Sequence, residues 1–226
     1  MKTVKFLFVL LFILSTPLQL FGRVTESAEN LLRIIHKVNR HWQENNSPQV
    51  RSFWDNAAYH TGNMEVYELT GNTAYLKYST DWAEYNHWKG AASDNKAEWR
   101  YGYGETPQYV LFGDWQCCFQ TYADLYGIRG DDRRIARARE VLEYQMGTDK
   151  NDYLWWADGL YMVMPVMTKL YRITKNPLYL EKLYEYFSYA DSVMYDPEAG
   201  LYYRDGSFVY PRHSILGGKK DFWARG

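Results

Sequence analysis

The chain carries a weak internal repeat. Three segments share one pattern, in which a tyrosine closes an apolar stretch, a short polar turn follows and a second stretch opens: Tyr67–Leu76, Tyr126–Asp131 and Tyr171–Leu180. Gly71 and Gly130 in the turns are expected to end helices in the left-handed conformation. Supersecondary units of this kind bury their apolar faces against one another. The repeat therefore predicts stacked helical hairpins joined by loops of unequal length.

Apolar periodicity places the helices. The first helices of the hairpins are expected over 55–70, 114–128 and 158–174, and the second helices over 73–88, 132–146 and 177–192. The first set is more apolar and the second more charged, which predicts an inner and an outer layer. A further helix is expected over 25–45. Loops are expected over 89–113 and 193–222, with short strands near 200–203 and 207–210.

Two ways of closing such an array are compatible with the repeat. An open superhelix would repeat more evenly, whereas a toroid tolerates long loops on one face. The long aromatic loops favour an all-α (α/α)6 toroid. Six such hairpins need roughly 300 residues or more, by extension of the repeat. The 226 residues are therefore expected to form about the N-terminal half of a catalytic barrel domain that spans 23–226 and is incomplete at its C-terminus.

The first residues resemble a secretory leader. Lys2 and Lys5 precede an apolar run, Phe6–Leu14, and a polar break at Ser15–Pro17 follows. The run is too short to span a bilayer, although a retained membrane anchor is the alternative. We expect a signal peptide over 1–22, a periplasmic or secreted protein, and no membrane association after cleavage.

Charge and cysteine usage exclude several partners. The net charge of −1 argues against nucleic-acid binding. Cys117 and Cys118 are adjacent, so they face different directions on a helix and are expected to be core residues without a disulfide. No metal or nucleotide motif is present, and no cofactor is expected. The aromatic content of 18% suits a sugar-binding cleft, although aromatic residues also fill cores.

Each first helix carries an aspartate near its start. Asp55 and Asp114 lie 12 residues before the repeat tyrosine, and Asp158 lies 13 before its own. In a toroid these helix starts meet at one mouth, so the carboxylates should share a rim. Aspartate is also a favoured N-cap, which explains each residue without any chemistry. Because sugar-bond cleavage uses carboxylate pairs, we take Asp114 and Asp158 as the candidate pair and Asp55 as mainly structural.

Three segments resemble a known family. Trp155–Pro165 is similar to the W-x-D-G-L-Y-M-x-x-P segment of the unsaturated rhamnogalacturonyl hydrolases, glycoside hydrolase family 105, which are related to the unsaturated glucuronyl hydrolases of family 88. Lys219–Gly226 resembles the F-W-x-R-G-N-G-W segment, and Asp114–Tyr126 resembles the inner helix D-D-x-x-x-x-Q-x-Y-x-x-L-Y. The resemblance covers about 50–226, and its motifs are specific together and weak alone.

The resemblance implies a six-hairpin toroid that hydrolyses oligosaccharides ending in a Δ4,5-unsaturated uronic acid. In that family an aspartate protonates C4 of the vinyl ether, water adds at C5, and the hemiketal opens to release the aglycone without a metal or a covalent intermediate. Carried over to this chain, the general acid/base is Asp158 and the sugar packs on Trp156. Arg225, in the segment with Trp223, would pair with the uronate carboxylate.

The chain departs from the family pattern at one position and adds further candidates. Where the family has two aspartates, this chain has Asp114 and then Trp115. Arg204 lies in a loop that supplies substrate contacts in relatives, or is a solvated hairpin charge. Trp54 and His60 either line the cleft or belong to the core.

Two other functions remain open from the residues. A sugar epimerase or a different glycosidase uses the same toroid, although epimerases rely on cleft histidines and none of the five histidines falls among the three aspartates. A non-catalytic carbohydrate-binding protein is the other alternative. For the hydrolase, the expected partner is an oligosaccharide substrate.

Overall fold

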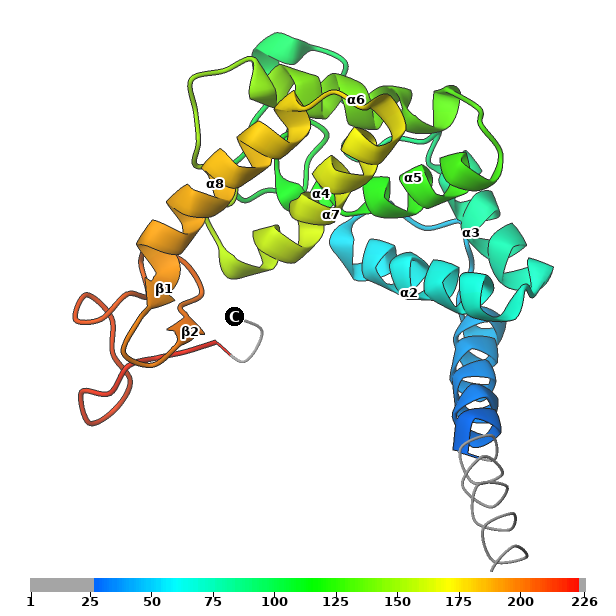
Figure 1. Cartoon of the computed structure of the whole chain (residues 1–226), viewed down its shortest axis with the longest axis horizontal. Coiled ribbons are helices and arrows are strands. Elements are labelled where there is room, and N and C mark those ends of the chain that lie inside the picture. Colours follow the sequence, from blue (N-terminus) through cyan, green and yellow to red (C-terminus); the bar gives the residue numbers. More distant parts are fainter. Residues whose placement is uncertain (1–26, 224–226) are drawn as a thin grey trace, which may run out of the picture. The chain divides into compact units, whose positions relative to one another are not determined.

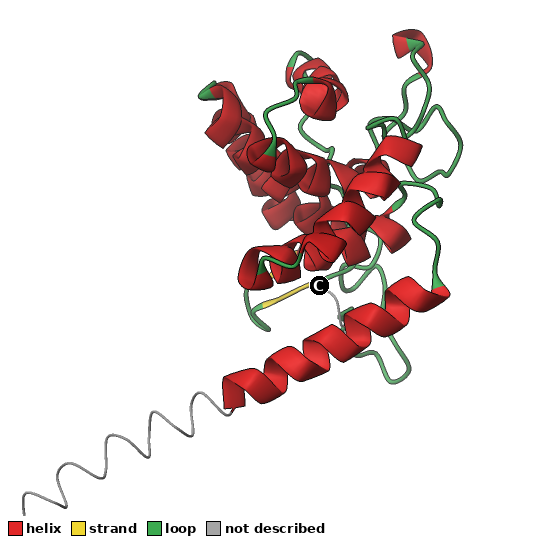
Figure 2. Ribbon diagram, turned by 90° about the vertical axis from the view of Figure 1, so that its right-hand side faces the viewer, coloured by secondary structure: helices red, strands yellow, loops and turns green. Residues whose placement is uncertain are grey.

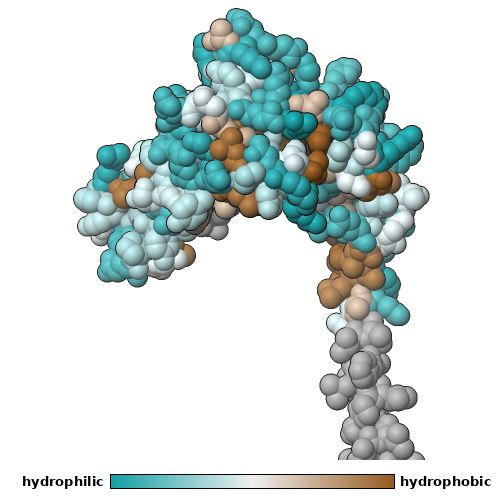
Figure 3. Space-filling model, turned by 45° about the horizontal axis from the view of Figure 1, so that its top comes forward, coloured by the Kyte–Doolittle hydropathy of each residue, from teal (hydrophilic) through white to brown (hydrophobic). Residues whose placement is uncertain are grey.

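A computed structural model describes residues 27–223 of the chain, which divides after Ser47 into two compact units. The first unit contains a helix over 27–45. Leu31, Ile34 and Val38 of this helix are exposed, and Figure 3 shows the apolar surface that the helix presents. Within 27–223 no helix is long and apolar enough to cross a membrane. The signal peptide expected over 1–22 lies outside the described residues.

The second unit consists of three helical hairpins followed by a loop segment. The hairpins pair α2 (Trp54–Thr70) with α3 (Thr73–Tyr85), α4 (Gly113–Gln116) and α5 (Cys118–Ile128) with α6 (Arg133–Met146), and α7 (Ala157–Thr174) with α8 (Leu178–Met194) (Figure 1, Figure 2). The predicted all-α hairpin array is confirmed. The helix expected over 73–88 ends earlier, at Tyr85. His87 and Trp88 have positive φ angles and turn the chain away from the helix axis.

The helices form the two expected layers. Helix α5 packs between α2 and α7, and α3, α6 and α8 cover this inner row (Figure 1). The inner helix α5 buries Phe119, Tyr122 and Leu125, whereas α6 points Arg133 and Arg139 to solvent. Burial of large aromatic side chains between the layers is the main stabilising contribution to such a core.

The repeat tyrosines close two hairpins in the same way. Gly71 (φ 66°) and Lys175 (φ 60°) are left-handed, and their N–H groups donate to the carbonyls of Tyr67 and Tyr171, over 2.7 and 2.8 Å. The middle turn differs, because the Arg129 N–H donates to the Leu125 and Tyr126 carbonyls. Gly130 is not left-handed, so the expected glycine cap is wrong there.

Two further local predictions need correction. The helix expected over 114–128 is broken at Cys117, where Gly90 lies so close that a Cβ on it would be 2.0 Å from the Trp115 carbonyl oxygen. The short strand β2 (Leu201–Tyr202) exists and pairs with β1 (Tyr195–Asp196). No strand forms over 207–210, because Asp205 accepts the Ser207 N–H and closes a turn.

Candidate active site

The three aspartates occupy equivalent positions in the inner helices. Each is the second residue of its helix, and the N-caps are the aromatic residues two positions earlier: Phe53, Phe112 and Trp156. These caps are extended and make no side-chain capping bond. The N-cap interpretation of Asp55, Asp114 and Asp158 is therefore wrong. Their carboxylates lie in the first turn, where the helix dipole favours negative charge.

A pocket of about 440 Å³ opens at these helix starts. Eleven residues from all three inner helices and from both long loops line it: Trp54, Tyr103, Phe112, Asp114, Trp155, Trp156, Asp158, Met162, Arg204, Asp205 and Trp223. The expectation that the starts of the inner helices gather at one mouth is confirmed. Asp114 is buried and Asp158 is half-buried. The arrangement places two carboxylates among aromatic walls, which is how sugar-binding clefts combine polar groups with apolar faces.

Asp55 and His60 lie outside this pocket. Asp55 is exposed and pairs with Arg51 over 3.2 Å. His60 is buried, stacks on Trp82 with ring centroids 3.9 Å apart, and is 3.0 Å from the Ser79 hydroxyl. Burial lowers the pKa of His60 to about 3. The suggestion that His60 lines the cleft is therefore replaced by its core role, which the sequence had left open.

Close backbone approach brings the helix starts of α4 and α7 together. A Cβ on Gly113 would lie 2.8 Å from the outer edge of the Trp156 ring and 3.0 Å from Val163. Only glycine fits there without displacing the indole. The absence of this side chain allows Asp114, the next residue, to share a pocket with Asp158.

Trp115, which stands where the family has its second aspartate, makes structural contacts. Its ring is buried against Phe53, and its indole N–H donates to the Gly104 carbonyl over 3.2 Å. The indole of Trp155 likewise donates to the Tyr101 carbonyl over 3.1 Å. Trp115 does not line the pocket, whereas Asp114 does, and the two indoles fix the loop that carries Tyr103.

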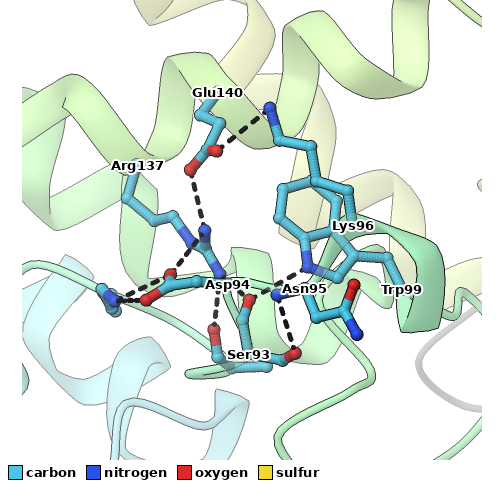
Figure 4. A network of polar contacts seen from close by, with 9 residues as sticks. Ser93, Asp94, Asn95, Lys96, Trp99, Arg137 and Glu140 are labelled. Atoms are coloured by element: carbon cyan, nitrogen blue, oxygen red, sulfur yellow. Dashed lines mark hydrogen bonds and ion pairs between the residues drawn. The ribbon is translucent and has the colours of Figure 1, made fainter.

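The other end of this loop is anchored on the outer layer. Figure 4 shows Arg137 of α6 between Asp94 and Glu140, at 3.2 and 2.7 Å. Its guanidinium also donates to the Ser93 carbonyl and lies 4.9 Å above the Trp99 ring. Charge-assisted hydrogen bonds of this kind are stronger than neutral ones. The pocket loop is therefore held at both ends by buried side chains.

The segment after β2 forms the wall of the pocket beside the start of α7. The Ala157 N–H, which a helix start leaves without an internal partner, donates to the Arg204 carbonyl over 2.8 Å. A β-bridge joins Trp156 to Asp205. These contacts place Arg204 and Asp205 beside Asp158. Trp223 lines the pocket as well, while Arg225 lies outside the described residues.

Several lining residues were not anticipated from the sequence: Tyr103, Phe112, Trp155, Met162 and Asp205. One signal was present, since an aromatic residue precedes each of the three aspartates by two positions. Tyr103 arrives from a loop, and only tertiary contacts place it. A smaller recess of about 150 Å³ adjoins the pocket, and Asp158 lines both.

Burial and specific contacts shift the pKa values of ionisable groups around the pocket. Burial, together with the nearby Asp114 carboxylate, raises the pKa of Cys117 to about 12, so this thiol stays protonated. Burial opposes ionisation of Asp205, but hydrogen bonds from Ser207 and Arg204 outweigh it and lower the pKa of Asp205. Both cysteines are buried and free, as expected. Within 27–223 no three acidic, histidine or cysteine side chains are grouped to hold a metal ion.

Comparison with known proteins identifies the family. The sequence profile of Glycosyl Hydrolase Family 88 matches residues 28–226. The chain belongs to this family. The resemblance in the motifs had pointed to family 105 and its relative, family 88, and the match confirms the recognition at the level of the family. A curated relative, the unsaturated 3S-rhamnoglycuronyl hydrolase of Formosa agariphila, is 25% identical over 76% of the chain and 47% of its own length.

Solved structures share the fold of this family 88 chain. A family 88 glycosyl hydrolase from Bacteroides vulgatus is 68% identical, with a TM-score of 0.85 over 86% of the chain and 56% of its own. A chain described as a polysaccharide lyase is 69% identical, with the same TM-score over 87% and 56%. A family 105 glycoside hydrolase from C. acetobutylicum, 20% identical with a TM-score of 0.57 over 80% and 52%, shares the fold. The chain thus spans about half the length of these relatives.

Proposed function

We propose that the protein is a glycoside hydrolase that releases Δ4,5-unsaturated uronic acid from the non-reducing end of lyase-generated oligosaccharides of the pectin or rhamnogalacturonan type. One observation carries the proposal. Asp114 and Asp158 start different inner helices and yet line one aromatic pocket that also contains Arg204. Membership of family 88 and the name of the Formosa relative support the same class of substrate.

In the proposed reaction, Asp158 supplies a proton to C4 of the C4=C5 vinyl ether. A water molecule adds its oxygen to C5 and returns a proton to the Asp158 carboxylate, which leaves a hemiketal. The hemiketal opens at C5, the hemiacetal at C1 collapses, and the aglycone departs with the glycosidic oxygen. The acid is regenerated, and water is the one molecule consumed. General acid/base help of this kind is typically worth 10²–10⁴-fold.

The other candidate residues bind the sugar or assist the reaction in this proposal. Trp156 offers a ring face to the sugar, and Trp54 and Trp223 extend the aromatic walls. Asp114, buried beside the pocket, orients the substrate or the attacking water. Arg225, which the family resemblance offers as a partner for the uronate carboxylate, lies outside the described residues.

A single absorbance assay tests the proposal. The protein is mixed with a lyase-made unsaturated disaccharide, and the ultraviolet absorbance of the C4=C5 bond is followed together with free aglycone. We expect absorbance to fall as aglycone appears in equal amount. The saturated disaccharide should not be cleaved, because it has no vinyl ether to protonate. Cleavage of the saturated sugar at a comparable rate would contradict hydration and indicate an ordinary glycosidase.

The same assay separates a second candidate function. A 69% identical chain is described as a polysaccharide lyase, and a lyase forms the C4=C5 bond. On an intact uronic-acid polysaccharide, a lyase would therefore raise the absorbance, whereas the proposed hydrolase would leave the absorbance unchanged. A protein that binds these sugars and changes neither signal would be the non-catalytic alternative.

A further inference from the structure

Arg204 is held in one orientation by contacts on both its edge and its face. Its Nε donates to Asp205 Oδ2 over 2.8 Å. The central carbon of its guanidinium lies 3.8 Å from the centroid of the Phe208 ring and 5.9 Å from that of Trp223. Because its carbonyl is bound by the Ala157 N–H, the backbone is fixed as well. The planar group is thus oriented before any ligand arrives.

Hydrogen bonds fix the orientation of the Asp205 side chain. It is 7% exposed, and its Oδ1 accepts hydrogen bonds from the backbone N–H and the hydroxyl of Ser207. Its other oxygen is the one that Arg204 contacts. A carboxylate with donors on both oxygens keeps its charge and resists rotation. Asp205 therefore acts as a fixed anchor for the guanidinium.

The contacts of Arg204 leave its outer edge available. Among residues 27–223, the side chain of Arg204 makes one hydrogen bond and one ion pair, both to Asp205 through Nε. Neither contact uses the two Nη atoms. The side chain is 40% exposed, and Arg204 is the one cation among the described residues that line the pocket. The nearby Lys220 is engaged by Asp196 and Glu198 instead.

We propose that Asp205 and Phe208 hold Arg204 as a receptor for a carboxylate group of the sugar bound in the pocket. The inference rests on the proposed function, since it specifies how a uronic acid is distinguished from a neutral sugar at that site. Two parallel N–H donors match the two oxygens of a planar carboxylate. Pre-orientation by Asp205 removes the rotamer freedom that binding would otherwise have to restrict. Asp205 is a positioning residue in this scheme, because it acts through Arg204.

Binding measurements in an inactive background test the proposal. In the Asp158→Asn variant, affinities for the unsaturated disaccharide and for its methyl ester are measured by calorimetry or by tryptophan fluorescence. The ester lacks the anionic charge and should bind roughly 10- to 100-fold more weakly, the range for a charge-assisted hydrogen-bonded pair. Adding Arg204→Met should remove most of that difference, and Arg204→Lys should recover part of it.

The positioning role has its own variant and a matched control. Asp205→Asn should reduce the acid-to-ester preference several-fold while Arg204 remains present. Asp196→Asn alters another buried aspartate of the same segment, one that pairs with Lys220 and does not line the pocket. The control should leave the preference of the folded protein unchanged. Equal losses in both variants would mean that Asp205 only stabilises the loop, which contradicts its positioning role.

Other outcomes would overturn the receptor itself. A preference that survives Arg204→Met and disappears in Arg225→Met would assign the carboxylate to Arg225. Equal binding of acid and ester by the Asp158→Asn background would remove the receptor altogether. Because the readout is binding, a protein that hydrolyses the disaccharide without discriminating the ester disproves this inference alone, whereas discrimination without hydrolysis disproves only the proposed reaction.

Discussion

At the residue scale, the same position in three inner helices gives different environments. Asp55, Asp114 and Asp158 are all second residues of inner helices, two positions after an aromatic N-cap. Asp55 is exposed and paired with Arg51, whereas Asp114 and Asp158 line the pocket. The helix dipole acts on all three alike, so the neighbours decide the role. Candidate chemistry therefore follows from the pocket and not from the helix position.

His60 gives a prediction about acid stability. Its pKa in the folded protein is about 3, below its usual 6.5. Between these pH values the unfolded chain binds one more proton, so folding stability falls as pH decreases from 6.5 towards 3. We expect His60→Gln to lower stability near neutral pH by about 1–3 kcal/mol and to weaken this acid dependence. Urea unfolding at several pH values measures both.

The exposed His41 provides the control for that experiment. It lies on the helix over 27–45, and His41→Gln should leave the stability near neutral pH nearly unchanged. An acid dependence that is identical in wild type and His60→Gln would show that burial of His60 is not its cause.

The sequence predicted some residues of the pocket and missed others. Asp114, Asp158, Trp156, Arg204, Trp54 and Trp223 were expected and do line it. They were found because spacing and motif are local properties of the sequence. Tyr103 and Asp205 were missed, since the indoles of Trp115 and Trp155 and the β-bridge to Trp156 place them. His60 was ambiguous because a histidine at helical spacing suits either a core or a cleft.

At the scale of elements, Gly113 controls how closely α4 approaches α7. Gly113→Ala would place a methyl group 2.8 Å from the Trp156 ring. We expect a loss of about 1–3 kcal/mol in stability from overpacking and a lower kcat/KM from displacement of the pocket wall. Gly62→Ala in α2 is the control, because nothing lies within 4 Å of the added Cβ. That variant should be stabilised by up to about 1 kcal/mol. Equal behaviour of the two variants would refute the role of close approach.

The Arg137 network gives the second prediction at this scale. Arg137→Met removes bonds to two carboxylates and to the Ser93 carbonyl. We expect a stability loss of about 2–3 kcal/mol, since charge-assisted hydrogen bonds are lost, and faster proteolysis within 89–113. Arg139→Met on the same helix breaks only an exposed pair with Glu143, which is worth about 0.2–1 kcal/mol. A loss no larger than that of the control would contradict the anchoring role.

The helices could be predicted because each one has a local periodic pattern of apolar residues in the sequence. The starts of α2, α6 and α7 fall within one residue of the expected positions. The break at Cys117 and the missing strand over 207–210 were not predictable in this way. Gly90, which is distant in sequence, contacts the first, and the Asp205 side chain determines the second. At the first place a tertiary contact overrides local propensity, whereas at the second a local side-chain turn takes the place of the strand.

At the scale of the whole molecule, the second unit forms an outer and an inner layer, with the pocket at the inner helix starts. The second unit alone contains the whole described pocket. The chain covers 47% and 56% of two relatives, so its activity is a proposal for the protein as a whole. The family 88 assignment and the hairpin fold do not depend on that proposal.

We propose that residues 1–22 direct the protein out of the cytoplasm and are then removed. Lys2, Lys5 and the apolar run Phe6–Leu14 motivate the proposal. Mass spectrometry of the protein from a periplasmic or secreted fraction should give a mature chain that begins at Arg23. A protein recovered from the membrane with Met1 still attached would support the anchor instead.

The central claim is that Asp158 is the proton donor and acceptor of this pocket. Asp158→Asn keeps the size of the side chain, so the fold should be retained, while turnover of the unsaturated disaccharide should fall by roughly 10²–10⁴-fold. Asp55→Asn makes the same chemical change at the same helix position outside the pocket and should keep near wild-type turnover. If Asp158→Asn instead retains more than roughly a tenth of the rate, well above that range, Asp158 is not the catalytic acid and the account is wrong.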